Sequence, residues 1–228
     1  MFVLSKFSDL VRIEPSKFSQ STEAALEDEI NAKYANKVVQ DVGLCLCLFD
    51  ILEVGDGLIR HGDGGAYINT VFRLVVFRPF VGEVLVGWIS SCSEEGIRVR
   101  MDFFDDIFIP KEYLFEGCIF VPSEQAWVWR TEHDLYLDTN EKIRFKVEQE
   151  IFTDQSPQGP KNILAEEGGN NHNNNNHNNN GNNTSNNRDE NAQQQMLLHG
   201  GGGPNIAPPY SLVGSCQTYG MGLVTWWD

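Results

Sequence analysis

The sequence has no long uninterrupted run of apolar residues and comparatively few basic residues. Both shortages limit the classes of protein to which it can belong. None of its 228 residues belong to a window of the roughly 18–20 uncharged apolar residues that a membrane helix needs. Residues 1–15 are not expected to be a secretory signal, because Asp9 and Arg12 interrupt the apolar residues and no small-residue cleavage site follows. Lys and Arg number 17 against 32 Asp and Glu, a formal charge of −15. This excess of acid argues against tight, autonomous binding of bare nucleic acid.

The five cysteines and five histidines show no spacing typical of a disulfide framework, a metal site or a catalytic group. An odd cysteine count of this kind favours a reducing compartment. Cys45 and Cys47 are expected on one face of a strand, where buried thiols acting as small apolar groups are favoured over metal ligands. Asp105 and Asp106 are adjacent, so strand alternation favours a turn over a carboxylate pair. We therefore expect no metal, no cofactor and no catalytic residue.

Composition changes abruptly in the segment 154–207. Between Asn170 and Asn187, 13 of 18 residues are asparagine. Such a stretch cannot bury enough apolar surface to offset the entropy lost on ordering. Aromatic residues return after Pro208, which a disordered terminus would not require. The pattern predicts a disordered Asn/Gly-rich insertion at 154–207 inside a folded domain.

The remaining sequence predicts an α+β protein. Residues 1–80 read as a β–α–β–β unit, with 54–65 as a loop containing two Gly-Asp-Gly turns. The helix is indicated by apolar residues at steps of four, namely Leu26, Ile30, Tyr34 and Val38. Residues 81–153 and 208–228 contain short strands with glycine at the bends, which fits a small β-barrel.

Basic and aromatic residues occur together on the predicted barrel strands, as they do where OB folds bind single-stranded nucleic acid. Arg98 and Arg100 share a strand face, which must meet solvent or ligand because unpaired buried charge is costly. Alternation instead places Phe104 and Phe108 in the core. The candidates for RNA contact are Arg98, Arg100, Phe103, Lys111 and Arg130. The competing interpretation is that the phenylalanines simply fill the barrel.

Seven sequence blocks occur in an order that resembles the OB-containing stalk subunit of eukaryotic RNA polymerase III, within the eukaryotic and archaeal stalk family. They are MFVLSKFSDLVRIEP, YANKVVQDVGLCLCLFDI, VVFRPFVGEVLVG, EEGIRVRMDFFDDIFIP, QAWVWR, HDLYLDTNEKIRFKVEQEIF and GLVTWW. The resemblance covers residues 1–158 and 209–228, and the Asn-rich tract departs from it. FFDDIFIP and the WW ending resemble the polymerase III branch more than the shorter polymerase II relative.

This resemblance implies an N-terminal RNP-like tip domain at 1–80, which anchors the stalk to the polymerase core. It implies an OB-fold barrel at 81–153 and 208–228, which meets nascent RNA or initiation factors. It also implies a heterodimer with a smaller helical subunit, nuclear localisation and no catalysis, because polymerisation of small RNAs such as tRNA and 5S rRNA belongs to the large subunits. The core or partner contacts it implies are Gly55, Asp56, Gly57, His61, Gly62, Asp63 and Gly64. A free single-stranded RNA-binding OB-fold protein is the alternative, and no membrane association is expected.

Overall fold

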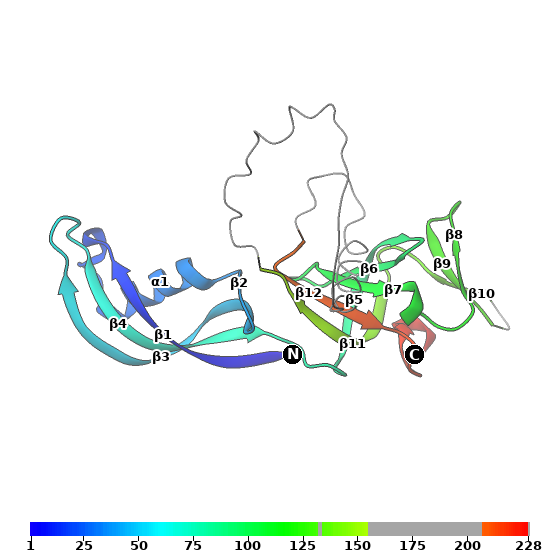
Figure 1. The fold of residues 1–228 in the computed structure, drawn as a ribbon, viewed down its shortest axis with the longest axis horizontal. Coiled ribbons are helices and arrows are strands. Elements are labelled where there is room, and N and C mark those ends of the chain that lie inside the picture. The colour runs from blue at the N-terminus through cyan, green and yellow to red at the C-terminus, as the bar shows by residue number, and fades with distance from the viewer. Residues whose placement is uncertain (132–133, 155–206, 228) are drawn as a thin grey trace, which may run out of the picture. The chain divides into compact units, whose positions relative to one another are not determined.

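The structure, a computed structural model, describes residues 1–131, 134–154 and 207–227, and arranges them mainly in β-sheets (Figure 1). The described residues form three sheets, of four, three and six strands. Met1–Thr153 and Pro208–Asp228 constitute one compact unit. The α+β class is therefore confirmed. The predicted disorder of 154–207 falls almost entirely on 155–206, which lie outside the described residues.

The N-terminal sheet is antiparallel, with the strand order β1-β4-β3-β2. Its strands are β1 (Phe2–Ile13), β2 (Lys37–Val39), β3 (Gly43–Ile59) and β4 (Ala66–Phe77). Helix α1 (Thr22–Tyr34), which follows the short 3-10 helix Pro15–Lys17, packs against this sheet (Figure 1). Its fully buried Leu26 and Ile30 belong to one apolar cluster with Phe72 and Leu74 of β4.

The sequence predicts a helix capped by Ser21 or Thr22, and the structure selects Ser21, but the helix ends earlier than its apolar stripe indicates. The Ser21 hydroxyl accepts a hydrogen bond from the amide of Ala24 at 3.3 Å, which caps the first turn. Asn36 has a φ of +58°, a left-handed conformation that ends the helix. Val38 therefore lies in β2, and assigning it to the helical stripe was wrong.

Strand β3 is longer and more irregular than the alternation in its sequence indicates. It continues through the first Gly-Asp-Gly to Ile59, so the predicted turn at Gly55–Gly57 was wrong. Register shifts against β4 occur at four places along it, including between Val54 and Gly57. Such bulges absorb an extra residue in one strand. Another shift, between Cys45 and Cys47, leaves the first thiol buried and the second exposed, so these cysteines do not share a face.

The predicted small barrel is confirmed. Its strand order is β12-β7-β6-β5-β11, and β12 also pairs with β11, which closes the ring. The strands are β5 (Val84–Ser93), β6 (Gly96–Arg100), β7 (Ile107–Pro110), β11 (Lys142–Phe152) and β12 (Tyr210–Ser215). The short β13 (Gly222–Leu223) adds to β11 and precedes a 3-10 turn at Val224–Trp226. Inward residues such as Ile97, Phe145 and Leu212 are fully buried.

A three-stranded sheet follows β7 and was not predicted as a separate unit. It consists of β8 (Cys118–Val121), β9 (Ala126–Arg130) and β10 (Asp134–Leu137), in the order β10-β9-β8. The Trp127 indole donates a hydrogen bond to the backbone oxygen of Ser93 at 2.9 Å, which ties the sheet to the end of β5. Trp129 stacks on Phe115 with ring centroids 4.3 Å apart.

The N-terminal domain and the barrel share a seam of aromatic and ionic contacts. Phe77 at the end of β4 packs on Phe103 and Phe104, with ring centroids 5.0 and 5.2 Å apart. Arg78 donates two hydrogen bonds to the Glu150 carboxylate of β11, at 3.1 and 2.6 Å.

Among the described residues, no helix has the length and apolar character needed to cross a membrane.

Candidate nucleic-acid interface

Arg98 and Arg100 lie on the outer face of β6, as predicted. They alternate with Ile97 and Val99, which are fully buried in the barrel. The barrel wall thus holds their backbone rigid while their side chains point outward. The sequence pattern G-I-R-V-R is sufficient to predict this geometry.

Trp88 on β5 forms the centre of this face. Its ring centroid lies 5.9 Å from the guanidinium carbon of Arg100 and 5.6 Å from the Nζ of Lys142 on β11. The backbone registers agree, since Trp88 is opposite Arg100 on one side and Lys142 on the other. Grooves that bind single-stranded nucleic acid combine aromatic rings, on which bases stack, with cations that meet the phosphates, and this face has both kinds of group.

Trp88 and Lys142 were absent from the predicted set. The signal for Lys142 was present in K-I-R-F-K, where basic residues alternate with the buried Ile143 and Phe145. What the sequence did not contain was the pairing between β5 and β11, whose residues are more than fifty positions apart. The remaining predicted residues lie elsewhere.

Phe103 belongs to the seam between the N-terminal domain and the barrel. Its ring contacts Phe2 and Phe77, at centroid distances of 5.8 and 5.0 Å, and the residue is 37% exposed. Part of the ring surface is therefore already committed to packing. Phe104 is buried in the barrel core, which confirms its predicted place. Phe108 is also buried, but it lies opposite Arg98 in the strand register and its ring centroid is 5.9 Å from the Arg98 guanidinium carbon. It therefore shares the outer face of the barrel with Arg98, and its predicted place in the core was wrong.

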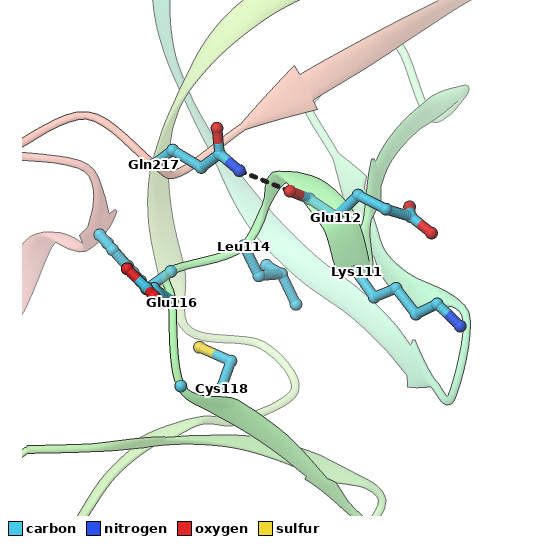
Figure 2. Close-up of a pocket in the computed structure, with 8 residues that line it drawn as sticks. Lys111, Glu112, Leu114, Glu116, Cys118 and Gln217 are labelled. Carbon is cyan, nitrogen blue, oxygen red and sulfur yellow. Dashed lines mark hydrogen bonds between the residues drawn. The ribbon is translucent and has the colours of Figure 1, made fainter.

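Lys111 begins a 3-10 turn, Lys111–Tyr113, after β7 and lines a pocket of about 510 Å³. Figure 2 shows its side chain directed away from Cys118, another of the lining residues. The other lining residues include the acidic Glu112 and Glu116. Burial raises the pKa of Cys118 to about 11, so its thiol is protonated at neutral pH. The pocket therefore offers neither an anion site nor a reactive nucleophile.

Arg130 ends β9, in the three-stranded sheet, and is exposed. It lies opposite Asp134 of β10 in the strand register. It thus belongs to a different sheet from Arg98 and Arg100, and a carboxylate is its cross-strand neighbour. Of the five predicted RNA contacts, the structure brings only the two β6 arginines onto one strand face.

The predicted anchoring residues divide between a strand and a turn. Gly55, Asp56 and Gly57 lie in β3, whereas His61–Gly64 form the turn of the β3–β4 hairpin. Leu58 and Ile59, just before the turn, are 72% and 66% exposed. The hairpin therefore presents apolar side chains that no other described residue covers.

Asp63 orders the hairpin turn. Its carboxylate accepts hydrogen bonds from the Tyr67 hydroxyl at 2.7 Å, the Gly65 amide at 2.7 Å and the Arg12 Nε at 3.1 Å. These contacts, that of Tyr67 foremost, lower the pKa of Asp63 to about 2. The turn is thereby joined to both β1 and β4.

The described residues contain no group of three or more His, Cys, Asp or Glu side chains placed to hold a metal ion. Burial raises the pKa of the Cys45 and Cys92 thiols to about 11. The described surface presents cations, aromatic rings and exposed apolar side chains, which are groups that bind other molecules.

Comparison with known proteins first defines a class: an SHS2 domain followed by an OB-like barrel. The sequence model of the "SHS2 domain found in N terminus of Rpb7p/Rpc25p" matches residues 8–64. The model described as "RNA polymerase III subunit Rpc25" matches residues 83–227, which is more than half of the chain. The chain belongs to the Rpc25 family.

Three relatives align with the whole of this chain. It is 46% identical to the DNA-directed RNA polymerase III subunit RPC8 of Saccharomyces cerevisiae and 44% identical to rpc8 of Schizosaccharomyces pombe, each over the full length of both proteins. It is 39% identical to RPC8 of Bos taurus, covering 98% of that protein. The predicted polymerase III branch of the stalk family is therefore confirmed.

Proposed function

We propose that this chain is a non-catalytic stalk subunit of nuclear DNA-directed RNA polymerase III. That enzyme transcribes small RNAs such as tRNA and 5S rRNA. The observation that carries the proposal is the full-length identity of 39–46% to proteins named as subunits of that polymerase. The barrel and the N-terminal sheet fit a role in binding. The division into 1–80, 81–153 with 208–228, and 154–207 remains our prediction.

The N-terminal domain is proposed to anchor the subunit to the polymerase core through the β3–β4 hairpin. The exposed Leu58 and Ile59 and the turn ordered by Asp63 support this assignment. Apolar side chains on a rigid hairpin can bury their surface in another protein with little loss of conformational entropy.

A smaller helical subunit is proposed to cover the groove between α1 and β3. This hollow, of about 570 Å³, is lined by α1 residues including Glu23 and Glu27 and by β3 residues including Phe49 and Leu52. Phe49 and Leu52 are large and exposed, as expected of a surface that another chain buries.

Affinity purification of the tagged full chain from nuclear extract tests the function. We expect a large multisubunit polymerase to co-purify. Leu58→Asp with Ile59→Asp should remove the core subunits, whereas Ile119→Asp with Tyr136→Asp, an exposed apolar pair on the three-stranded sheet, should retain them. Recovery of RNA without polymerase subunits would instead favour the free RNA-binding alternative.

The barrel is proposed to contact nascent RNA or initiation factors, with the RNA contact centred on Trp88, Arg100 and Lys142, beside Arg98. Residues 81–152 contain 7 basic and 15 acidic groups, so the attraction is local and weak overall. Screening acts over about 8 Å at physiological ionic strength. The two cations flanking Trp88 lie within that range of its ring.

Titration of a single-stranded RNA oligonucleotide at several salt concentrations tests this face. Arg100→Glu with Lys142→Glu should weaken binding and lower the slope of log affinity against log salt by about 1.4, or about 0.7 for each phosphate that is no longer neutralised. Lys111→Glu with Arg130→Glu makes the same charge change at the other predicted residues. An equal effect of the two pairs would show that net charge, and not the Trp88 face, governs binding.

A further inference from the structure

A strip of exposed apolar residues leads from the end of the N-terminal domain onto the barrel. Phe80, Val81, Val84 and Val86 are 65%, 60%, 47% and 44% exposed. Phe80 and Val81 lie in a turn in which the amide of Glu83 donates to the oxygen of Phe80 at 3.0 Å. Val84 and Val86 then follow on the outer face of β5, because Leu85 between them is buried. We call these four residues the apolar strip.

A row of cations lies beside the apolar strip on β11. In the strand register, Lys146 is opposite Val84 and Arg144 is opposite Val86. The basic side chains alternate with the buried Phe145, so they share the outer face with the valines. Each exposed valine thus has a cation directly across from it, on a strand about 5 Å away.

The two cations of this row are held in different ways. Arg144 donates a hydrogen bond to the backbone oxygen of Gly220 at 3.2 Å, which fixes its position on the face. Lys146 pairs with Glu148 at 2.7 Å, and both side chains are about one-third exposed. An exposed pair of this kind is weak and can exchange its partner carboxylate for one of another protein.

We propose that the apolar strip and its cation row dock an acidic amphipathic helix of a partner protein. Three of the four residues of the strip are valines, whose aliphatic side chains fit the apolar face of such a helix, and Phe80 is its one aromatic ring. Carboxylates on the flank of the helix complement Arg144 and Lys146. The occupant lies across the face, since β5 already pairs with β11 on one side and with β6 on the other.

The net charge of the chain means that an acidic partner can bind only at a local basic site. At −15 the protein repels acidic segments in general, so attachment of one requires a local site. The strip is separate from the β3–β4 hairpin proposed for anchoring. It adjoins the face around Trp88, because Trp88 follows Val86 by two residues on the same side of β5. The docking inference is therefore independent of the anchoring assignment, and the oligouridine probe below separates it from the RNA assignment.

The test uses the full chain and three labelled probes in fluorescence anisotropy. The first is a 16-residue helical peptide with leucines on one face and glutamates beside them. The second replaces every glutamate with lysine, and the third is an oligouridine of similar size. We expect the acidic peptide to bind more tightly than the basic one.

A matched pair of variants locates the binding. Val86→Ser with Lys146→Glu should weaken binding of the acidic peptide at least tenfold. Val3→Ser with Lys6→Glu makes the same changes at exposed positions of β1 and should leave the affinity within twofold. Unchanged thermal midpoints of both variants would show that all four side chains are dispensable for folding. If the strip variant unfolds, Lys146→Gln alone is used, with an expected loss of about threefold.

Three results would overturn the proposal. They are no binding of the acidic peptide, equal loss in both variant pairs, and tighter binding of oligouridine that depends on Val86 and Lys146. The last would make the strip a nucleic-acid surface. Polymerase co-purification, measured separately on the same variants, reports on the proposed function and not on the strip.

Discussion

At the scale of single residues, Asp63 shows how one side chain can order a turn. Its three hydrogen bonds come from β1, from β4 and from the turn itself. If water took the place of any of these donors, the turn would lose its hydrogen bond to β1, to β4 or within itself. The carboxylate must be ionised to accept all three bonds, which makes the order of the hairpin dependent on pH.

The first prediction concerns this dependence. The pKa of Asp63 is lowered from an ordinary 3.8 to about 2, so its stabilising contribution is complete above about pH 4 and is lost as pH falls towards 2. Hydrogen exchange at the amides of 60–65 should therefore accelerate over that range beyond its intrinsic pH dependence. Asp63→Asn should show fast exchange at every pH. If the variant keeps the wild-type protection at pH 6, the carboxylate does not order the turn.

The second prediction concerns Gly96, in the hairpin between β5 and β6. A Cβ there would overlap the backbone oxygen of Ile109 and approach the Phe108 ring to 2.9 Å. Gly96→Ala should lower the free energy of unfolding by about 1–3 kcal/mol in chemical denaturation. Gly82→Ala is the control, because Gly82 also has positive φ but has open space around its Cβ position. Equal losses would assign the effect to backbone conformation and not to the clash.

At the scale of elements, the barrel depends on a strand that is distant in sequence. β12 pairs with β11 over six registered positions and with β7 in parallel. Without it, both neighbours have open edges, and the core loses the buried Tyr210 and Leu212. Unpaired strand edges promote aggregation.

The third prediction is that a 1–207 fragment will not fold cooperatively. Loss of one large buried aromatic residue alone costs about 3–5 kcal/mol, and here paired strands are removed as well. The matched control replaces 155–206 with a short Gly/Ser linker and retains β12. Loop-closure entropy depends only weakly on length, so its thermal midpoint should remain near that of the full chain. A soluble fragment with a single sharp unfolding transition would contradict the prediction.

The sequence predicted elements best where the determining contacts are local. The helix and the outward arginines of β6 follow from short-range periodicity, and the cap at Ser21 or Thr22 follows from the residue types at the helix start. The continuation of β3 through Gly55–Gly57 did not, because a glycine inside a bulged strand has the same composition signal as a turn. Trp88 and Lys142 were missed for another reason: their proximity comes from strand pairing between distant segments, which single-sequence patterns do not encode.

At the scale of the whole molecule, the bridge between Arg78 and Glu150 links the N-terminal domain to the barrel. It is bidentate, and the Arg78 guanidinium also lies 5.6 Å from the Phe152 ring centroid. More than a third of the Arg78 side chain is exposed, so solvent weakens the ion pair and its contribution to stability is small. Its effect is therefore on the coupling of the two parts more than on either part alone.

The fourth prediction is that this bridge contributes to cooperative unfolding. Arg78→Ala and Glu150→Ala should each destabilise the protein by about 1 kcal/mol or less, and a double-mutant cycle should give a coupling of the same order. The calorimetric transition should broaden or divide as the two parts unfold separately. Arg60→Ala, which removes a cation on the hairpin, is the control. Strict additivity in the cycle would show that the pair does not couple them.

The closure of the barrel by β12 also sets an order of events during synthesis. The ribosome completes β5, β6, β7 and β11 more than fifty residues before it delivers β12. All strands of the N-terminal sheet come from the first 77 residues, so that sheet can form while translation continues. Until β12 is available, the barrel stays open between β7 and β11, and the edges of these two strands are unpaired. For the time needed to translate that interval, this half of the nascent chain is a client for chaperones that shield unpaired strand edges.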